Sequence, residues 1–91
     1  MTIIARYPLV QGGEVVYLPM PIGSRILSVQ VQKGTACLFA LVDTTQPIVT
    51  RALRWAAVGE VVTTSDANDY IGTFQLYGGT EVFHLFDLGE I

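Results

Sequence analysis

The sequence predicts an all-β domain, a small antiparallel sandwich or barrel of six or seven strands with at most one short helical turn. Two segments alternate between apolar and polar side chains around a glycine-containing two-residue link, which is typical of β-hairpins. Glycine and proline interrupt the remaining chain at short intervals, and no segment keeps a clear helical spacing. The 91 residues suffice for one domain, which we place at residues 1–91.

Six strands follow from composition and alternation. They are residues 3–10, 15–18, 25–32, 35–42, 70–77 and 80–86. Pro8 places the first strand at a sheet edge or ends its hydrogen-bond ladder. The two prolines that flank Met20 exclude a helix in residues 19–23 and favour extended backbone.

Residues 48–58 fit two interpretations, a strand or a helix. The apolar positions that nearly alternate are Val49, Leu53, Trp55 and Ala57, and those that fit a helical stripe are Ala52, Leu53, Ala56 and Ala57. We favour a strand because the neighbouring segments are β and Gly59 ends the run. The polar residues 60–69 that follow predict a surface loop or a single helical turn.

The glycine links determine which side chains share a face. If Gly78–Gly79 is a two-residue turn, Phe74 lies opposite Phe83 and Thr73 opposite His84. The same counting gives each hairpin one apolar face. These faces are Leu27, Val29, Val31, Ala36, Leu38 and Ala40 in the first hairpin and Phe74, Leu76, Phe83 and Leu85 in the second. We expect them to form the core, at roughly 1.5–3 kcal/mol for each large side chain fully buried.

The opposite faces mix large apolar with polar side chains. They are Ile26, Ser28, Gln30, Cys37, Phe39 and Leu41 in the first hairpin and Ile71, Thr73, Gln75, Val82, His84 and Phe86 in the second. Such a surface suits a partly hydrated contact with another copy or another protein. Cover by a strand or loop of the same chain is the other interpretation, and both stay open. The candidate interface residues are Ile26, Phe39, Leu41, Val82 and Phe86.

Composition limits the classes of partner. Hydrophobic residues make up 51% of the chain and charged residues 14%, so the chain has more apolar surface than a small monomer can bury. Self-association is the simplest way to bury the surplus. A net charge of -3 with five Lys and Arg residues disfavours nucleic acid. The first residues lack a basic region followed by a long apolar run, so we expect no signal peptide. No apolar run is long enough for a membrane helix, so we expect no membrane partner. The single cysteine, Cys37, fits a reducing intracellular setting.

Several side chains could carry chemistry, but each has a simpler structural role. His84 could act as a general base beside Thr73, although a hydrogen bond to that hydroxyl is favoured. Cys37 lacks a motif that would lower its pKa, so a half-buried filler is the better interpretation. The oxygen-bearing residues of the polar loop, Asp66, Asn68 and Asp69, do not match a calcium-loop spacing. We therefore expect no catalytic residue, no metal and no cofactor.

Arg51, Arg54 and Trp55 form one basic and aromatic cluster. In a strand, Arg51 shares a face with Trp55 and Arg54 points away. In a helix, all three could lie together. A cation–π pair that shields the indole is the structural interpretation. Base stacking on Trp55 with arginine on phosphate is the functional one. Together with His84, these are the candidate polar or nucleic-acid contacts.

Much of the chain resembles a family of small bacteriophage and prophage proteins that is defined only as a domain of unknown function. The segments that carry the resemblance are residues 6–9, 18–23, 26–32, 38–43, 70–76 and 82–86, and residues 52–69 depart from it. The resemblance implies a phage origin and a location in the host cytoplasm or the virion. It implies no activity.

The sequence therefore favours a non-enzymatic protein–protein interaction module from a phage, assembled as a homo-oligomer. Its roles would be those of a minor virion or assembly component, or of an inhibitor of a host protein. The alternative is a small β-barrel that binds single-stranded nucleic acid or a nucleotide. An enzyme built around His84 ranks third.

Overall fold

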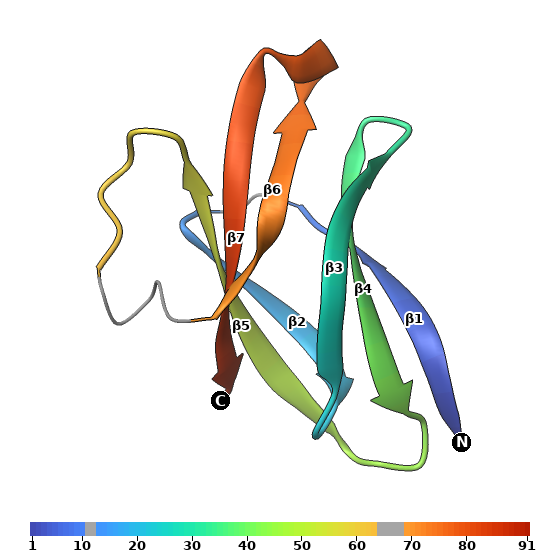
Figure 1. Cartoon of the computed structure of the whole chain (residues 1–91). Helices are drawn as coiled ribbons and strands as arrows, with labels where there is room; N and C mark the ends of the chain where they lie inside the picture. The colour runs from blue at the N-terminus through green and yellow to red at the C-terminus, as the bar shows by residue number, and fades with distance from the viewer. Residues whose placement is uncertain (11–12, 64–68) are drawn as a thin grey trace.

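Seven strands of the described chain form two antiparallel sheets that pack face to face (Figure 1). The computed structural model describes residues 1–10, 13–63 and 69–91. The strands are β1 (Thr2–Pro8), β2 (Val15–Pro21), β3 (Arg25–Gln32), β4 (Thr35–Asp43), β5 (Ile48–Ala57), β6 (Tyr70–Leu76) and β7 (Glu81–Glu90). One sheet has the order β1-β4-β3 and the other the order β2-β5-β7-β6. The segment 48–58, which fitted a strand or a helix, forms strand β5, so the favoured interpretation is confirmed. The predicted all-β sandwich is also confirmed.

Alternation along the strands places one face of each sheet in a shared core. Leu38, Leu53 and Leu85 have no exposed surface. Trp55 joins them from β5, with ring centroids 4.8 Å from Phe74 and 5.3 Å from Phe83. These inward side chains lie two residues apart along each strand, as the period-two pattern predicts.

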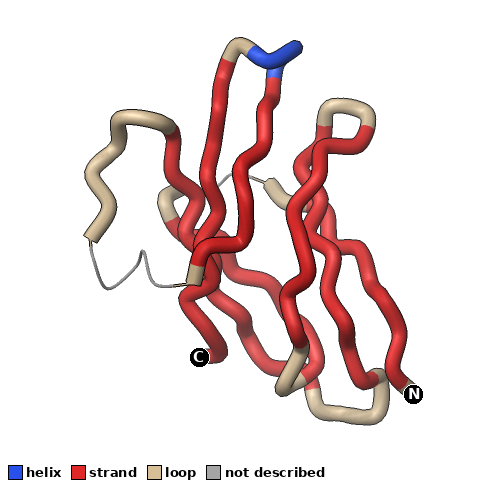
Figure 2. Tube along the Cα trace, in the orientation of Figure 1, coloured by secondary structure: helices blue, strands red, loops and turns tan. Residues whose placement is uncertain are grey.

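The second hairpin has the predicted register. Phe74 lies opposite Phe83 and Thr73 opposite His84. Its tip is a single 3-10 turn, Tyr77–Gly79, the blue segment of Figure 2 among strands drawn in red. Gly78 and Gly79 both adopt positive φ angles, of 69° and 89°, which an L side chain rarely adopts.

Two bulges change the predicted faces at the far ends of both hairpins. The register of β3 against β4 shifts between Ile26 and Ser28, so Ile26 packs against the core while Leu27 is 42% exposed. The prediction that placed Leu27 in the core and Ile26 on the mixed face is therefore wrong. The register of β6 shifts between Tyr70 and Gly72, so Ile71 turns to the core instead. An extra residue in one strand inverts the alternation beyond it.

The four edge strands differ in how they are protected. β2 contains Pro19 and Pro21, which an edge strand tolerates because proline has no N–H for a second ladder. β3 and β6 belong to different sheets but lie side by side (Figure 1), and a Cβ built on Gly72 would come 3.3 Å from Cγ1 of Val29. β1 is the remaining edge, as Pro8 predicted.

In residues 1–10, 13–63 and 69–91, no helix has the length and apolar character needed to cross a membrane.

The bulge in β3 predicts effects of different size for two neighbouring truncations. Ile26→Ala should lower the free energy of unfolding by about 2 kcal/mol, because it removes core contacts. Leu27→Ala should change it by less than about 0.5 kcal/mol, because the side chain is exposed. Urea denaturation of both variants measures the difference. A larger loss for Leu27→Ala would contradict the bulge.

Candidate functional site: the open face beside β1

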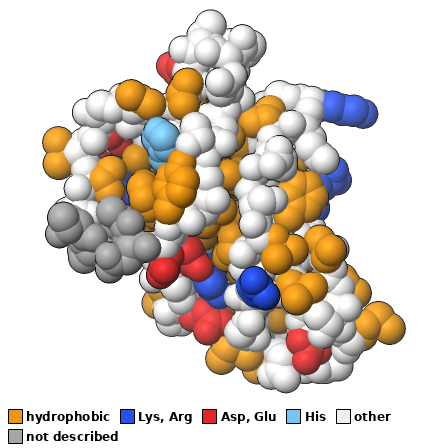
Figure 3. Space-filling model, in the orientation of Figure 1, with side chains coloured by type: hydrophobic (Ala, Val, Ile, Leu, Met, Phe, Trp, Pro, Cys, Tyr) orange, Lys and Arg blue, Asp and Glu red, His pale blue; other side chains and the backbone are white. Residues whose placement is uncertain are grey.

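The outer face of the β1-β4-β3 sheet carries apolar side chains at its centre. Ile4 of β1 lies opposite Leu41 of β4, and in the next row Arg6 lies opposite Phe39. Ile4 is 65% exposed, Leu41 is 36% exposed and Phe39 is half-buried. Figure 3 shows hydrophobic side chains on the right-hand side of the molecule, where these strands lie. We call this surface the open face.

Basic side chains surround the open face. Arg6, Arg25 and Lys33 all belong to β1, β3 or the turn after β3. None of the three forms an ion pair with another described residue, and Arg6 donates instead to the amide oxygen of Gln32 at 3.0 Å. Arg6 and Lys33 also line a groove together with Cys37, which is 4% exposed. Cys37 is thus more deeply buried than the half-buried position predicted for it.

The inner edge of β1 is fully paired, and both its ends are fixed. All seven residues of β1 pair with β4. The N–H of Leu9 donates to the carbonyl oxygen of Ala36 at 2.8 Å. At the other end the terminal ammonium lies 3.3 Å from the Asp43 carboxylate. Hydrogen bonds from Thr45 and then the charge of this ammonium lower the pKa of Asp43 to about 2.

The mixed face of the second hairpin is partly covered by the chain itself. The bulge places Tyr70 over β7, with its ring 5.2 Å from Phe86 and 5.9 Å from His84. The Tyr70 hydroxyl lies 2.9 Å from Nδ1 of His84, the Thr73 hydroxyl lies 3.0 Å from the same atom, and the two hydroxyls also contact each other. His84 therefore has the hydrogen-bonding role that the sequence favoured.

Val82 and the outer side of β5 lie beside the segment that follows β5. The N–H of Val58 donates to the carbonyl oxygen of Val82 at 3.3 Å. Arg54 is 3% exposed and donates to Glu60 and to the carbonyl oxygens of Val61, Glu14 and Trp55. This arginine binds residues 60–61 to the four-stranded sheet.

Arg51 of β5 forms an ion pair with Asp87 of β7, the neighbouring strand of the same sheet. Its Nε and Nη2 donate to the two oxygens of Asp87 at 2.9 and 2.5 Å, and its Nη1 donates to the Ser24 carbonyl oxygen at 2.9 Å. Burial alone would raise the pKa of Asp87, but the hydrogen bonds from Arg51 and from the Gly89 N–H outweigh it and lower this pKa. The bond to Asp87 raises the pKa of Arg51.

The predicted nucleic-acid cluster does not form a surface. Trp55 is 2% exposed, so its ring is not available for the base stacking of the functional interpretation. The indole is shielded by Phe74 and Phe83 rather than by the arginine proposed for a cation–π pair. Arg51 and Arg54 contact carboxylates of their own chain.

The candidate interface residues thus separate into three environments. Phe39 and Leu41 lie together on the open face, and Val82 and Phe86 lie under or beside other parts of the chain. Ile26 packs against the core. No group of three or more His, Cys, Asp or Glu among the described residues is placed to hold a metal ion. Asp66 and Asn68 of the polar loop lie outside the described residues.

A family comparison covers almost the whole chain. Residues 1–90 match the family described as Domain of unknown function (DUF7352). The chain is a DUF7352 protein. No curated protein and no solved structure matches it.

Sequence reasoning missed three residues of this DUF7352 protein that border the candidate surfaces. Ile4 and Arg6 reach the open face because β1 pairs with β4, where their partners Leu41 and Phe39 lie far along the chain. Their spacing of two residues indicates that both side chains lie on one face of a strand, but it does not show which strand lies beside it. Tyr70 reaches His84 only because of the bulge, which the alternation does not show.

The Arg51–Asp87 pair predicts a loss of stability in acid. The folded-state pKa of Asp87 is lowered, so the stabilisation is present above the ordinary aspartate pKa of about 4 and is lost as the pH falls through the folded value. Asp87→Asn should lower the free energy of unfolding by about 2–3 kcal/mol at pH 7, because it leaves a half-buried arginine without its carboxylate. Urea denaturation at pH 7 and pH 3 measures both effects.

Glu81→Gln, which removes an exposed carboxylate at the start of β7, is the matched control and should leave stability at pH 7 unchanged. An Asp87→Asn variant as stable as the parent at pH 7 would contradict the role given to the pair.

Proposed function

We propose that this DUF7352 protein is a non-enzymatic protein–protein interaction module that pairs with a second copy through β1 and the open face beside it. The observation that carries the proposal is the outer edge of β1. Its backbone N–H and C=O groups on that side pair with no described residue, and Ile3 and Ile4 beside them are 41% and 65% exposed. An exposed, apolar edge strand is a template for pairing with another chain.

β1 is favoured as the pairing edge because the other edges are less suited to pairing. Prolines occupy β2, and β3 and β6 lie against each other. Two β1 strands related by a two-fold axis run antiparallel, which is the geometry of the pairing already present between β1 and β4. Such a dimer would bring Ile4 of both copies to one seam and extend the open face across it.

The side chains of the open face have the composition of an interface. Ile4, Phe39 and Leu41 supply an apolar centre, and Arg6 and Arg25 lie around it. Interfaces are enriched in aromatic residues and arginine and are polar at the rim. The cluster proposed for nucleic acid does not support that alternative, since its tryptophan and both its arginines are engaged within the chain.

The resemblance to small bacteriophage and prophage proteins supports a phage origin for the module. Within that proposal it acts in the host cytoplasm or as part of the virion. A paired sandwich suits a minor structural or assembly component, or a small inhibitor that presents the open face to a host protein.

The test compares two isoleucines of similar exposure on different sheets. Ile4→Lys places a charge from each copy at the seam and should raise the dimer dissociation constant by about tenfold or more. Ile48, which is 63% exposed at the start of β5, is the matched control, and Ile48→Lys should leave the dissociation constant unchanged. Sedimentation equilibrium of the parent and both variants gives these values.

A parent protein that sediments as a strict monomer at micromolar concentration overturns the proposal. Equal weakening by both lysines would also overturn it, because the seam would then lie elsewhere. Urea denaturation of both variants checks that each stays folded.

A further inference from the structure

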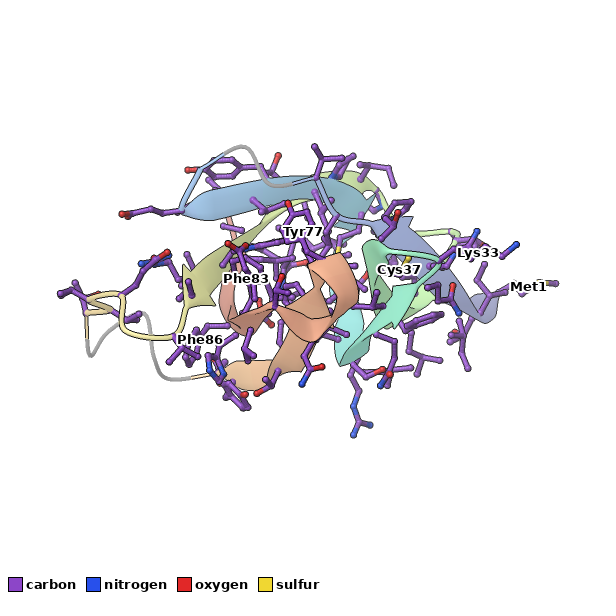
Figure 4. All side chains as sticks on the ribbon, turned by 90° about the horizontal axis from the view of Figure 1, so that it is seen from above. Met1, Lys33, Cys37, Tyr77, Phe83 and Phe86 are labelled. Carbon is purple, nitrogen blue, oxygen red and sulfur yellow. The ribbon has the colours of Figure 1, made fainter. Side chains whose placement is uncertain are left out.

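A groove crosses the outer face of the three-stranded sheet at the end where β3 turns into β4. The residues that line it are Arg6, Pro8, Gln32, Lys33, Thr35 and Cys37, and we call it the basic groove. All three strands contribute, because Pro8 lies opposite Cys37 and Gln32 opposite Thr35. Figure 4, which looks down on this end, shows Lys33 and Cys37 on the side of the molecule where β1 lies. Arg6 also lies opposite Phe39, so the basic groove continues into the open face.

The basic groove has more hydrogen-bond donors than acceptors. Arg6 donates from one guanidinium nitrogen to the amide oxygen of Gln32, so the amide NH2 group of Gln32 is left to donate elsewhere. Lys33 contributes an ammonium group and Thr35 a hydroxyl group, and the described residues of the lining include no carboxylate. Positive charge and donors without a carboxylate suit a ligand with an anionic oxygen.

Lys33 lies in a turn position that lysine seldom occupies. Lys33 and Gly34 form the two-residue link between the paired residues Gln32 and Thr35, with φ angles of 51° and 79°. In hairpin links of this kind the first position favours asparagine, aspartate or glycine, because longer side chains are strained at positive φ. Strained residues cluster at functional sites. The turn thus fixes a positive charge at the end of the basic groove, at a conformational cost that asparagine would reduce.

The charges of the rest of the sheet leave this end positive. In the described strands β1, β3 and β4 the sole carboxylate is Asp43, which lies at the opposite end of β4 and pairs with the terminal ammonium. The whole chain nevertheless has a net charge of -3, so most of its acidic side chains lie outside this sheet. A small positive site on an acidic protein suits a partner with a local acidic group, because the net charge repels an extended polyanion.

We propose that the basic groove binds an acidic segment of a partner protein, with a carboxylate at Arg6 and Lys33 and an apolar side chain of the same segment on Phe39. The inference rests on the proposed function and gives the chemistry of the partner that the open face receives. Phe39 lies two residues from Cys37 along β4, so an extended segment with its acidic and apolar residues two apart reaches both. A second copy is disfavoured as the occupant, because a contact between this sheet and the acidic regions of another copy is heterologous and does not close.

The test titrates the full chain, labelled with 15N, with a pair of short peptides that are acetylated and amidated. One peptide places a glutamate two residues before a leucine, and the other has glutamine in place of the glutamate and is otherwise identical. The glutamate peptide should move the amide resonances of Lys33, Thr35 and Cys37 in a saturable manner. The glutamine peptide should bind about five- to tenfold more weakly, because it offers no charge to the two cations.

Three variants locate the effect, followed on the amides of Thr35 and Cys37. Arg6→Gln should weaken binding of the glutamate peptide about five- to tenfold. Lys33→Asn removes the other charge and suits the left-handed backbone, so the hairpin stays folded while binding weakens about threefold or more. Arg25→Gln is the matched control, because it removes a cation from the same sheet at the opposite end of β3. It should weaken binding by less than about twofold.

Equal binding of the two peptides overturns the proposal, and so does an equal loss for Arg25→Gln and Arg6→Gln, since net charge rather than the groove would then be responsible. A single-stranded oligonucleotide that binds more tightly than the glutamate peptide would assign the cations to nucleic acid instead. An assembly larger than a dimer that Arg6→Gln dissociates would assign the groove to a second copy. Sedimentation of the parent is a separate measurement. A monomer that binds the glutamate peptide overturns the dimer and supports the groove, and a dimer whose groove amides the peptide does not move does the reverse.

Discussion

The packing of Trp55 against Phe74 and Phe83 is the contact on which the rest of the structure depends. It joins β5, β6 and β7 on their inner face and buries the largest side chain of the protein. Since alternate residues of a strand point to opposite sides, the inward direction of Trp55 also directs Arg51 inward and Arg54 outward. Each of these arginines is removed from bulk water, and each has a carboxylate within 3.3 Å. The aromatic core thus determines where the internal ion pairs form.

Most of the fold follows from local patterns in the sequence. Glycine at the two links predicted both hairpins, and period-two alternation predicted the register of Phe74 against Phe83 and the burial of Val29 and Leu38. The alternation failed at Ile26, Leu27 and Ile71, because an inserted residue leaves no mark in the pattern before the strand is paired. The partner of β1 could not be predicted either, since no short-range feature couples residues 2–8 to residues 37–43. The sequence therefore predicted the β4 side chains of the open face but not those that β1 contributes.

The two mixed faces illustrate how one pattern leads to two environments. Both hairpins place Phe or Leu among polar side chains, yet Tyr70 covers part of one face while Phe39 and Leu41 stay accessible on the other. The charged residues also differ between the two sheets. The basic residues without a carboxylate partner in the described chain lie in or beside β1 and β3, whereas Asp87, Glu60 and Glu90 pair with arginines of the four-stranded sheet. An accessible apolar centre and unneutralised cations therefore occur on the same sheet.

The prolines of β2 have a consequence for how large an assembly can grow. A polymer built by edge-to-edge strand pairing needs two unprotected sheet edges on each subunit, so that each added subunit exposes another edge. Here Pro19 and Pro21 remove two N–H donors from β2, and β3 and β6, edge strands of different sheets, lie side by side. In the proposed dimer, pairing along β1 would use the remaining edge of each subunit. Growth would then stop at a closed pair, which would keep a chain this rich in β-structure from forming fibrils.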